Sequence, residues 1–289
     1  MTMREKLIDG IWYLGVRAFR LTRKMHLSTR LEPLFIKASG LIPATRGELS
    51  ASMPNGKRLL MPADYRDLRT VRNGLFQSDE TKLFEELCGS GMTVIDVGAY
   101  VGYFTILASS LVGPRGRVYA LEPETTAFEY LKRNIHLNEC TNVVAINKAA
   151  SDKATTVLLR RDPKGPESFV TDSLRAFDGE TVEALSLDSL LGADDWPRVD
   201  VVKMNIEGSE LKALKGMREL SSRNPALQLV MEFNPTAMLR AGVSREDLTV
   251  TLSELGFRRG QIVERNLKEV PQPDLLPRVN TVYNIHLTK

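Results

Sequence analysis

From residue 92 onward, short strand-like runs alternate with stretches of helical periodicity, and few folds accommodate such a pattern. The strand-like runs, rich in β-branched and aliphatic residues, cover 92–97, 116–121, 142–147, 199–205, 227–233, 257–263 and 281–287. Helical periodicity fills the intervals at 102–112, 125–138, 209–217 and 245–255. Because strands that alternate with helices form a parallel sheet covered by those helices, we expect an α/β fold.

Composition excludes several other classes of protein. Of the 289 residues, 43% are hydrophobic and 26% are charged, which argues against collagen, coiled coil and global disorder. Two cysteines and three scattered histidines form neither a disulfide framework nor a metal-ligand cluster, so we expect no metal site. The longest uncharged stretch, 97–114, contains three glycines and predicts strand, turn and helix rather than a membrane span.

Positive charge is concentrated at the amino-terminal end of the sequence. Residues 1–47 carry nine Lys/Arg and three Asp/Glu, a net charge of +6, whereas the whole chain carries +3. The turn sequence Pro54-Asn55-Gly56 predicts a β-hairpin immediately after this segment. We therefore divide the chain into a basic extension, 1–46, and one α/β domain, 47–289.

Residues 4–26 have the pattern of one amphipathic helix, with Lys/Arg opposite a broad apolar face. The apolar face could pack on the domain or on a second subunit to form a homodimer, or the helix could lie on an anionic membrane. Nucleic-acid binding is disfavoured because interleaved aromatic side chains are absent. Since no signal peptide is evident, we expect a cytoplasmic protein, with peripheral inner-membrane contact under the membrane interpretation.

The sequence VIDVGAYVGYFT joins a hydrophobic strand to a helix through a glycine turn. Asp96 ends the strand, and Gly98 and Gly102 bracket a turn where backbone N–H groups and the positive helix end face a ligand. Glu122 ends the next strand, where a carboxylate can accept hydrogen bonds from both hydroxyls of a ribose. Taken singly, Asp96 could cap the turn and Glu122 could be a solvated acid.

This turn differs from the dinucleotide-binding fingerprint at Tyr100, because the fingerprint has glycine at that middle position. A bulky residue there leaves little room for a pyrophosphate, so an NAD-dependent oxidoreductase is the weaker alternative. The D-x-G-x-x-x-G form instead resembles the first motif of class I methyltransferases that use S-adenosylmethionine (SAM).

Several further segments, taken in order, resemble the FkbM-type methyltransferases. They are ALEPE at 120–124, NIHLNECTNV at 134–143, AASD at 149–152, ALSLDSLL at 184–191, VVKMNIEGSELKALKG at 201–216 and VMEFNP at 230–235. The resemblance implies a Rossmann-like class I methyltransferase fold, with a seven-stranded, mostly parallel sheet, helices on both faces and an antiparallel last strand. It also implies SAM as cofactor and methyl transfer to a hydroxyl of a sugar, glycolipid or polyketide-type acceptor.

The resemblance also assigns residues to the cofactor. The residues implied to line the methionine end of SAM are Asp96, Gly98, Tyr100 and Gly102. Glu122 is implied to hold the ribose. Asp152 follows the third strand and is the candidate for the adenine amino group, or else a turn residue.

The end of the fourth strand carries the candidate reaction chemistry. Asn205 stands where most FkbM-type proteins have aspartate; an amide can orient the cofactor but cannot act as a base. Glu207 is our candidate base, the alternative being a helix cap, and Glu232 is a second carboxylate, the alternative being an ion pair. Because of Asn205, a noncatalytic SAM-fold binding or assembly subunit stays open. The acceptor pocket is expected from the 153–186 insertion and the N-terminal region.

Overall fold

The computed structural model describes residues 48–62, 78–161, 168–171, 179–263, 268–270, 274–276 and 281–289. The predicted extension, 1–46, with its helix at 4–26, lies outside the described residues. The chain divides into two compact units, with the boundary between Phe76 and Gln77. In the first unit, β1 (Glu48–Ser52) and β2 (Arg58–Pro62) form the predicted antiparallel hairpin, whose turn contains Gly56 at a φ of 81°.

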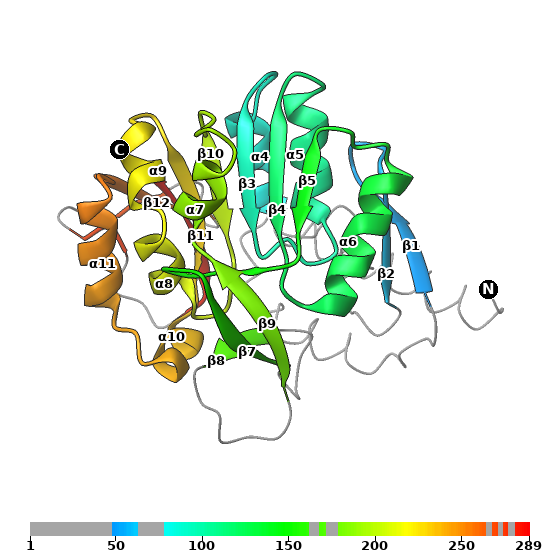
Figure 1. Cartoon of the computed structure of the whole chain (residues 1–289). Helices are drawn as coiled ribbons and strands as arrows, with labels where there is room; N and C mark the ends of the chain where they lie inside the picture. The colour runs from blue at the N-terminus through cyan, green and yellow to red at the C-terminus, as the bar shows by residue number, and fades with distance from the viewer. Residues whose placement is uncertain are drawn as a thin grey trace, which may run out of the picture. The chain divides into compact units, whose positions relative to one another are not determined.

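The second unit contains an eight-stranded sheet in the order β13-β12-β14-β11-β10-β3-β4-β5 (Figure 1). The strands are β3 (Thr93–Val97), β4 (Arg117–Leu121), β5 (Val143–Ile146), β10 (Val201–Met204), β11 (Gln228–Phe233), β12 (Arg259–Ile262), β13 (Lys268–Glu269) and β14 (Tyr283–Thr288). The five strands from β11 to β5 are parallel, and β14 is antiparallel to both β11 and β12. The expected seven-stranded, mostly parallel sheet with an antiparallel last strand is confirmed, and the two-residue β13 extends its edge.

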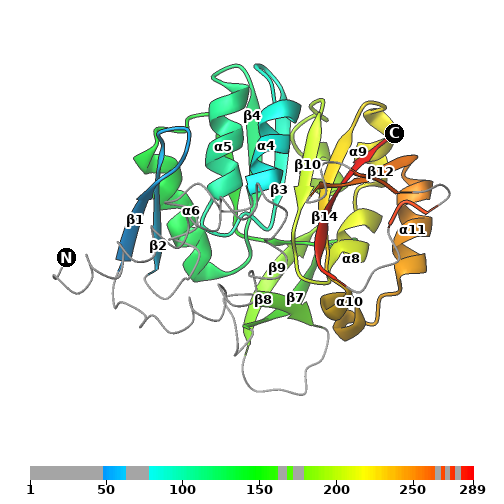
Figure 2. The same ribbon diagram turned by 180° about the vertical axis from the view of Figure 1, so that it is seen from behind.

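Helices cover both faces of this sheet, as predicted. They are α4 (Ser78–Leu87), α5 (Tyr103–Val112), α6 (Thr125–Leu137), α7 (Leu187–Gly192), α8 (Glu210–Lys215), α9 (Arg218–Arg223), α10 (Pro235–Ala241) and α11 (Arg245–Glu254). Figure 2 shows α4 and α5 in front of β3 and β4, and α8 and α11 lie over the opposite face (Figure 1).

The alternation of side chains along the central strands explains this arrangement. Ile95, Val97, Val202 and Met204 point into the larger hydrophobic core, which they share with α7, α8, α9 and α11. The residues between them, including Asp96, belong to the other face, beneath α5. Over the described parts of the chain we find no helix with the length and hydropathy of a transmembrane segment.

A second, four-stranded sheet is inserted after β5, in the order β6-β9-β7-β8. Its strands are β6 (Ala149–Ala150), β7 (Thr155–Arg161), β8 (Ser168–Thr171) and β9 (Glu180–Leu185), and the β7–β8 pairing confirms the predicted added hairpin. Figure 1 shows this sheet at the end of the main sheet where β11 leads into α10. The insertion therefore lies at the carboxyl ends of the parallel strands.

Candidate functional site

The turn between β3 and α5 is fixed by close backbone contacts. Gly98 and Ala99 each donate a hydrogen bond of 2.9 Å from their N–H groups to the carbonyl of Leu121. Gly98 has a φ of 82°, and a Cβ on this residue would lie 2.0 Å from the carbonyl oxygen of Asn205. Only glycine fits such a conformation at that distance, so the turn brings β3, β4 and the end of β10 together.

Glu122 links the end of β4 to the same turn. Its Oε2 accepts a hydrogen bond of 2.7 Å from the Tyr100 N–H, and its Oε1 accepts one of 2.9 Å from the Glu124 N–H. Burial, opposed by these two hydrogen bonds, raises the pKa of Glu122 to about 7. Each carboxylate oxygen keeps one further lone pair for a ligand hydroxyl.

Asp96 lies beneath the turn with only 1% of its surface exposed. Its Oδ2 accepts a hydrogen bond of 2.7 Å from the Thr105 hydroxyl on α5, and its Oδ1 lies 3.6 Å from Nζ of Lys203 on β10. In the described part of the structure, Oδ1 is buried and accepts no hydrogen bond. Among the described residues, Oδ1 of Asp96 is thus a buried acceptor that faces the ammonium group of Lys203 without a hydrogen bond.

The loop after β10, whose residues Asn205 and Ile206 lie against Gly98, carries Glu207, one of the two predicted catalytic residues. Glu210, in the first turn of α8, accepts hydrogen bonds from the N–H groups of Ile206 and Gly208 at 3.1 Å and 2.9 Å and so shapes the loop. Glu207 is half-buried at a φ of 51°, and its Oε2 accepts a hydrogen bond of 3.1 Å from the Asn234 amide. These contacts hold the Glu207 carboxylate between the ends of β10 and β11.

Glu232 lies beside Glu207 at the carboxyl end of β11. Its Oε1 is 3.4 Å from the Asn205 amide nitrogen, the donor. Burial and the charge of Glu207, with smaller contributions from Glu210 and Glu80, raise the pKa of Glu232 to about 9, although Lys203 opposes the shift. Glu232 is therefore protonated at neutral pH.

Glu232→Gln should stabilise the protein at alkaline pH, because glutamine mimics the protonated acid. A carboxyl whose pKa rises from 4.5 to about 9 on folding destabilises the fold increasingly as pH rises between those values. We expect the variant to gain about 1–3 kcal/mol of unfolding free energy at pH 8 and nearly nothing at pH 4.5. Urea denaturation at both pH values measures this; an equal gain at both would contradict the assignment.

Two residues of this site, Glu80 and Lys203, were not singled out by the sequence analysis. Glu80 is buried in the first turn of α4, where its sequence context predicts only helix capping. Lys203 stands inside an otherwise apolar buried strand, and that break in the hydrophobic pattern was the available signal. Asp152 is exposed and accepts a hydrogen bond from its neighbour Ser151, so its adenine role stays a prediction.

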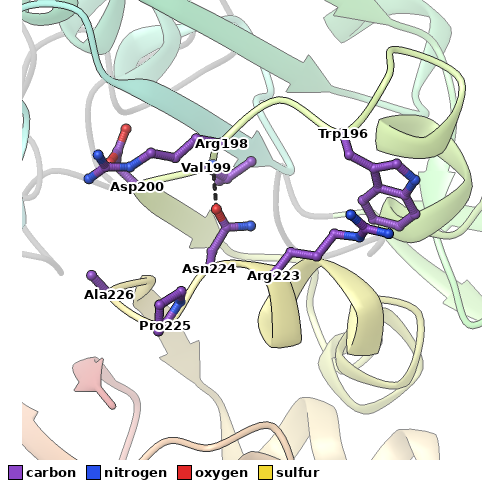
Figure 3. Close-up of a pocket in the computed structure, with 8 residues that line it drawn as sticks. All are labelled: Trp196, Arg198, Val199, Asp200, Arg223, Asn224, Pro225 and Ala226. Atoms are coloured by element: carbon purple, nitrogen blue, oxygen red, sulfur yellow. Dashed lines mark hydrogen bonds and ion pairs between the residues drawn. The ribbon is translucent and has the colours of Figure 1, made fainter.

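A surface pocket of about 580 Å³ lies at the opposite ends of β10 and β11, among residues that precede both strands (Figure 3). Its arginines are already engaged: Arg198 is 2.7 Å from the Asp200 carboxylate, and Arg223 lies over the ring of Trp196 at 4.6 Å. This pocket is separated from the glycine turn by the length of the strands. Among the described residues, no cluster of three or more His, Cys, Asp or Glu is placed to hold a metal ion.

Comparisons with known proteins agree with the resemblance seen in the sequence. Residues 96–259 match the Methyltransferase FkbM domain. The hexuronic acid methyltransferase AglP of Haloferax volcanii is 28% identical over 65% of this chain and 70% of its own length. The methyltransferase sdnD of Sordaria araneosa is 27% identical over 44% of this chain and 60% of its own. The M. jannaschii TYW2 structure in complex with AdoMet is 17% identical, covers 85% of this chain and 86% of its own, and has a TM-score of 0.46.

Proposed function

This chain belongs to the FkbM methyltransferase family, and on that premise we propose that it transfers the methyl group of SAM to a hydroxyl oxygen of a sugar-containing acceptor. The observation that carries the proposal is the pair of carboxyl groups, Glu207 and Glu232, at the ends of β10 and β11. Methylation of a hydroxyl requires removal of its proton, which a positioned carboxylate can accept. The relative from Haloferax volcanii, a hexuronic acid methyltransferase, supports a sugar acceptor.

The residues around the glycine turn fit SAM. The buried Oδ1 of Asp96, which accepts no hydrogen bond in the described part of the structure, suits the ammonium of the amino-acid end. The remaining lone pairs of Glu122 suit the ribose hydroxyls, and the Gly98 backbone allows a close approach. When bound, SAM supplies a methyl group already activated on a sulfonium.

Glu207 is the base in this proposal. Glu232 is protonated at neutral pH because burial and the adjacent Glu207 raise its pKa to about 9, so it cannot accept the proton. Glu207 is half-buried, and the Asn234 amide donates a hydrogen bond to its carboxylate. Asn205 contacts Glu232 and orients the cofactor rather than taking a proton.

The inserted sheet is the proposed wall of the acceptor pocket. It contacts the cofactor end of the main sheet through a hydrogen bond from the Thr125 hydroxyl to Glu180 and an ion pair of 2.8 Å between Lys148 and Glu183. Thr125 begins α6, immediately after the segment that includes Glu122. An acceptor held against this sheet would therefore reach the carboxyl ends of β10 and β11.

Glu122→Ala should weaken SAM binding by about 1.5–3 kcal/mol, the range for hydrogen bonds to a charged group. The variant removes the acceptors for the ribose and for the N–H groups of Tyr100 and Glu124. Isothermal calorimetry measures the loss, with Glu129→Ala as a control because Glu129 is an exposed helix residue that pairs with Lys132. Unchanged SAM affinity in Glu122→Ala would contradict the ribose assignment.

The function itself is tested by incubating the protein with methyl-labelled SAM and a panel of glycans, uronic-acid glycosides and polyketide alcohols. We expect label in a sugar-containing product, together with an equal amount of S-adenosylhomocysteine. Bound SAM with no label in any member of the panel would instead favour a noncatalytic binding subunit.

A further inference from the structure

Lys203 is a lysine buried in the centre of the main sheet, with 4% of its surface exposed. It lies directly beside Asp96 in the parallel pairing of β10 with β3, so both side chains emerge on the same face. Lysine is almost never buried to this degree without a partner, because removal of an ammonium from water is costly. Its position therefore requires a compensating group.

The compensating groups are Asp96 and an aromatic ring. Nζ of Lys203 lies 3.6 Å from Oδ1 of Asp96 and 4.9 Å from the centre of the Phe104 ring on α5. The Thr105 hydroxyl binds the other oxygen, Oδ2. The carboxylate of Asp96 is thus fixed from two sides, with Oδ1 facing the lysine and accepting no hydrogen bond within the described residues.

The surrounding charges show what the lysine balances. The pKa of Glu232 is raised by the charges of Glu207, Glu210 and Glu80, and it is lowered by the charge of Lys203. The charge of Asp96 also contributes to the raised pKa of Glu122. Without the ammonium, Asp96 would lose the cation that lies 3.6 Å from its Oδ1 and would be left as a buried carboxylate among other acids.

We propose that Lys203 is a positioning residue that holds the Asp96 carboxylate in place, directed at the ammonium group of the amino-acid end of SAM. This inference rests on the proposed role of Asp96 in cofactor binding. Lys203 acts through Asp96 and does not touch the reacting atoms. An Asp96 carboxylate that turns away would lose its charge-assisted interaction with the ligand ammonium, while contacts with the nucleoside would be unaffected.

The test compares two ligands that differ in the amino-acid end. S-adenosylhomocysteine has this end, whereas 5′-methylthioadenosine lacks it and keeps the nucleoside. Lys203→Met should weaken S-adenosylhomocysteine binding about ten- to hundredfold, as expected for one lost interaction with a charged group. It should leave 5′-methylthioadenosine binding unchanged, and Lys203→Arg should restore the affinity for S-adenosylhomocysteine. Calorimetry or competition binding measures both ligands.

A double variant keeps the proposal testable if Lys203→Met does not fold. Asp96→Asn combined with Lys203→Met removes both buried charges, so we expect it to fold. It should bind S-adenosylhomocysteine as weakly as Asp96→Asn alone, because the lysine acts through the aspartate. A further tenfold loss in the double variant, or equal losses for both ligands in Lys203→Met, would overturn the proposal. Absence of binding of either ligand to the wild-type protein would instead contradict the proposed cofactor site.

Discussion

Glu207→Gln should reduce methyl transfer by about 10²–10⁴, the usual contribution of a positioned base, while SAM affinity stays within a factor of about two. The amide keeps the size of the side chain and can still accept the hydrogen bond from Asn234. It cannot take the proton of a hydroxyl acceptor. Single-turnover rates and SAM titrations on the same preparations separate the two quantities.

The matched control for this prediction is Asn205→Asp, on the same loop. It should change turnover much less, because Asn205 donates a hydrogen bond to Glu232 and, in the proposed function, takes no proton. A sharp gain of activity in Asn205→Asp, with no effect of Glu207→Gln, would show that the base is assigned to the wrong position. Loss of SAM binding in Glu207→Gln would assign that glutamate to the cofactor instead.

Gly98→Ala should destabilise the protein by more than about 4 kcal/mol, or prevent folding, since it combines a forbidden contact with a strained backbone. The added Cβ would lie 2.0 Å from the carbonyl oxygen of Asn205 at a φ of 82°. That carbonyl cannot move away easily, because the N–H of Asn205 donates a hydrogen bond of 3.0 Å to Val97. Denaturant unfolding of soluble protein measures the effect.

Gly113→Ala provides the comparison at the other end of α5. Gly113 also has a positive φ, 66°, but a Cβ there would meet no atom within 4 Å. Its expected cost is the strained backbone conformation alone, with φ at 66° and ψ at −171°, about 1–3 kcal/mol, with SAM binding retained. Equal costs for the two alanine variants would mean that the close approach of β3 to the β10 loop is not what requires Gly98.

The order of the elements and the glycine turn between β3 and α5 could be predicted because both depend on local patterns. Strand runs such as 116–121 and the spacing of Gly98 and Gly102 are visible in the sequence, and β4 and α5 appear where those patterns place them. The two-residue β13 could not be predicted. Its antiparallel pairing with β12 requires the chain to fold back after β12, and no local sequence pattern predicts that.

The electrostatics of the site could not be predicted from the sequence. Glu232 is recognisable as a carboxylate at a strand end, but its raised pKa depends on burial and on the charge of Glu207, with smaller contributions from Glu210 on α8 and Glu80 on α4. The pairing of Asp96 with Lys203 likewise depends on the register between two strands that are more than a hundred residues apart. Motifs identify such residues, whereas only tertiary structure shows which charges meet.

The central claim, base-assisted methylation of a hydroxyl, is tested most directly by the chemical form of the transferred methyl group. A uronic acid offers both hydroxyls and a carboxylate, and only a hydroxyl acceptor requires a base. After reaction with methyl-labelled SAM, we expect a methyl ether that survives mild alkali and whose formation is lost in Glu207→Gln. Label released by mild alkali as methanol, formed equally well by Glu207→Gln, would identify a methyl ester and contradict the account.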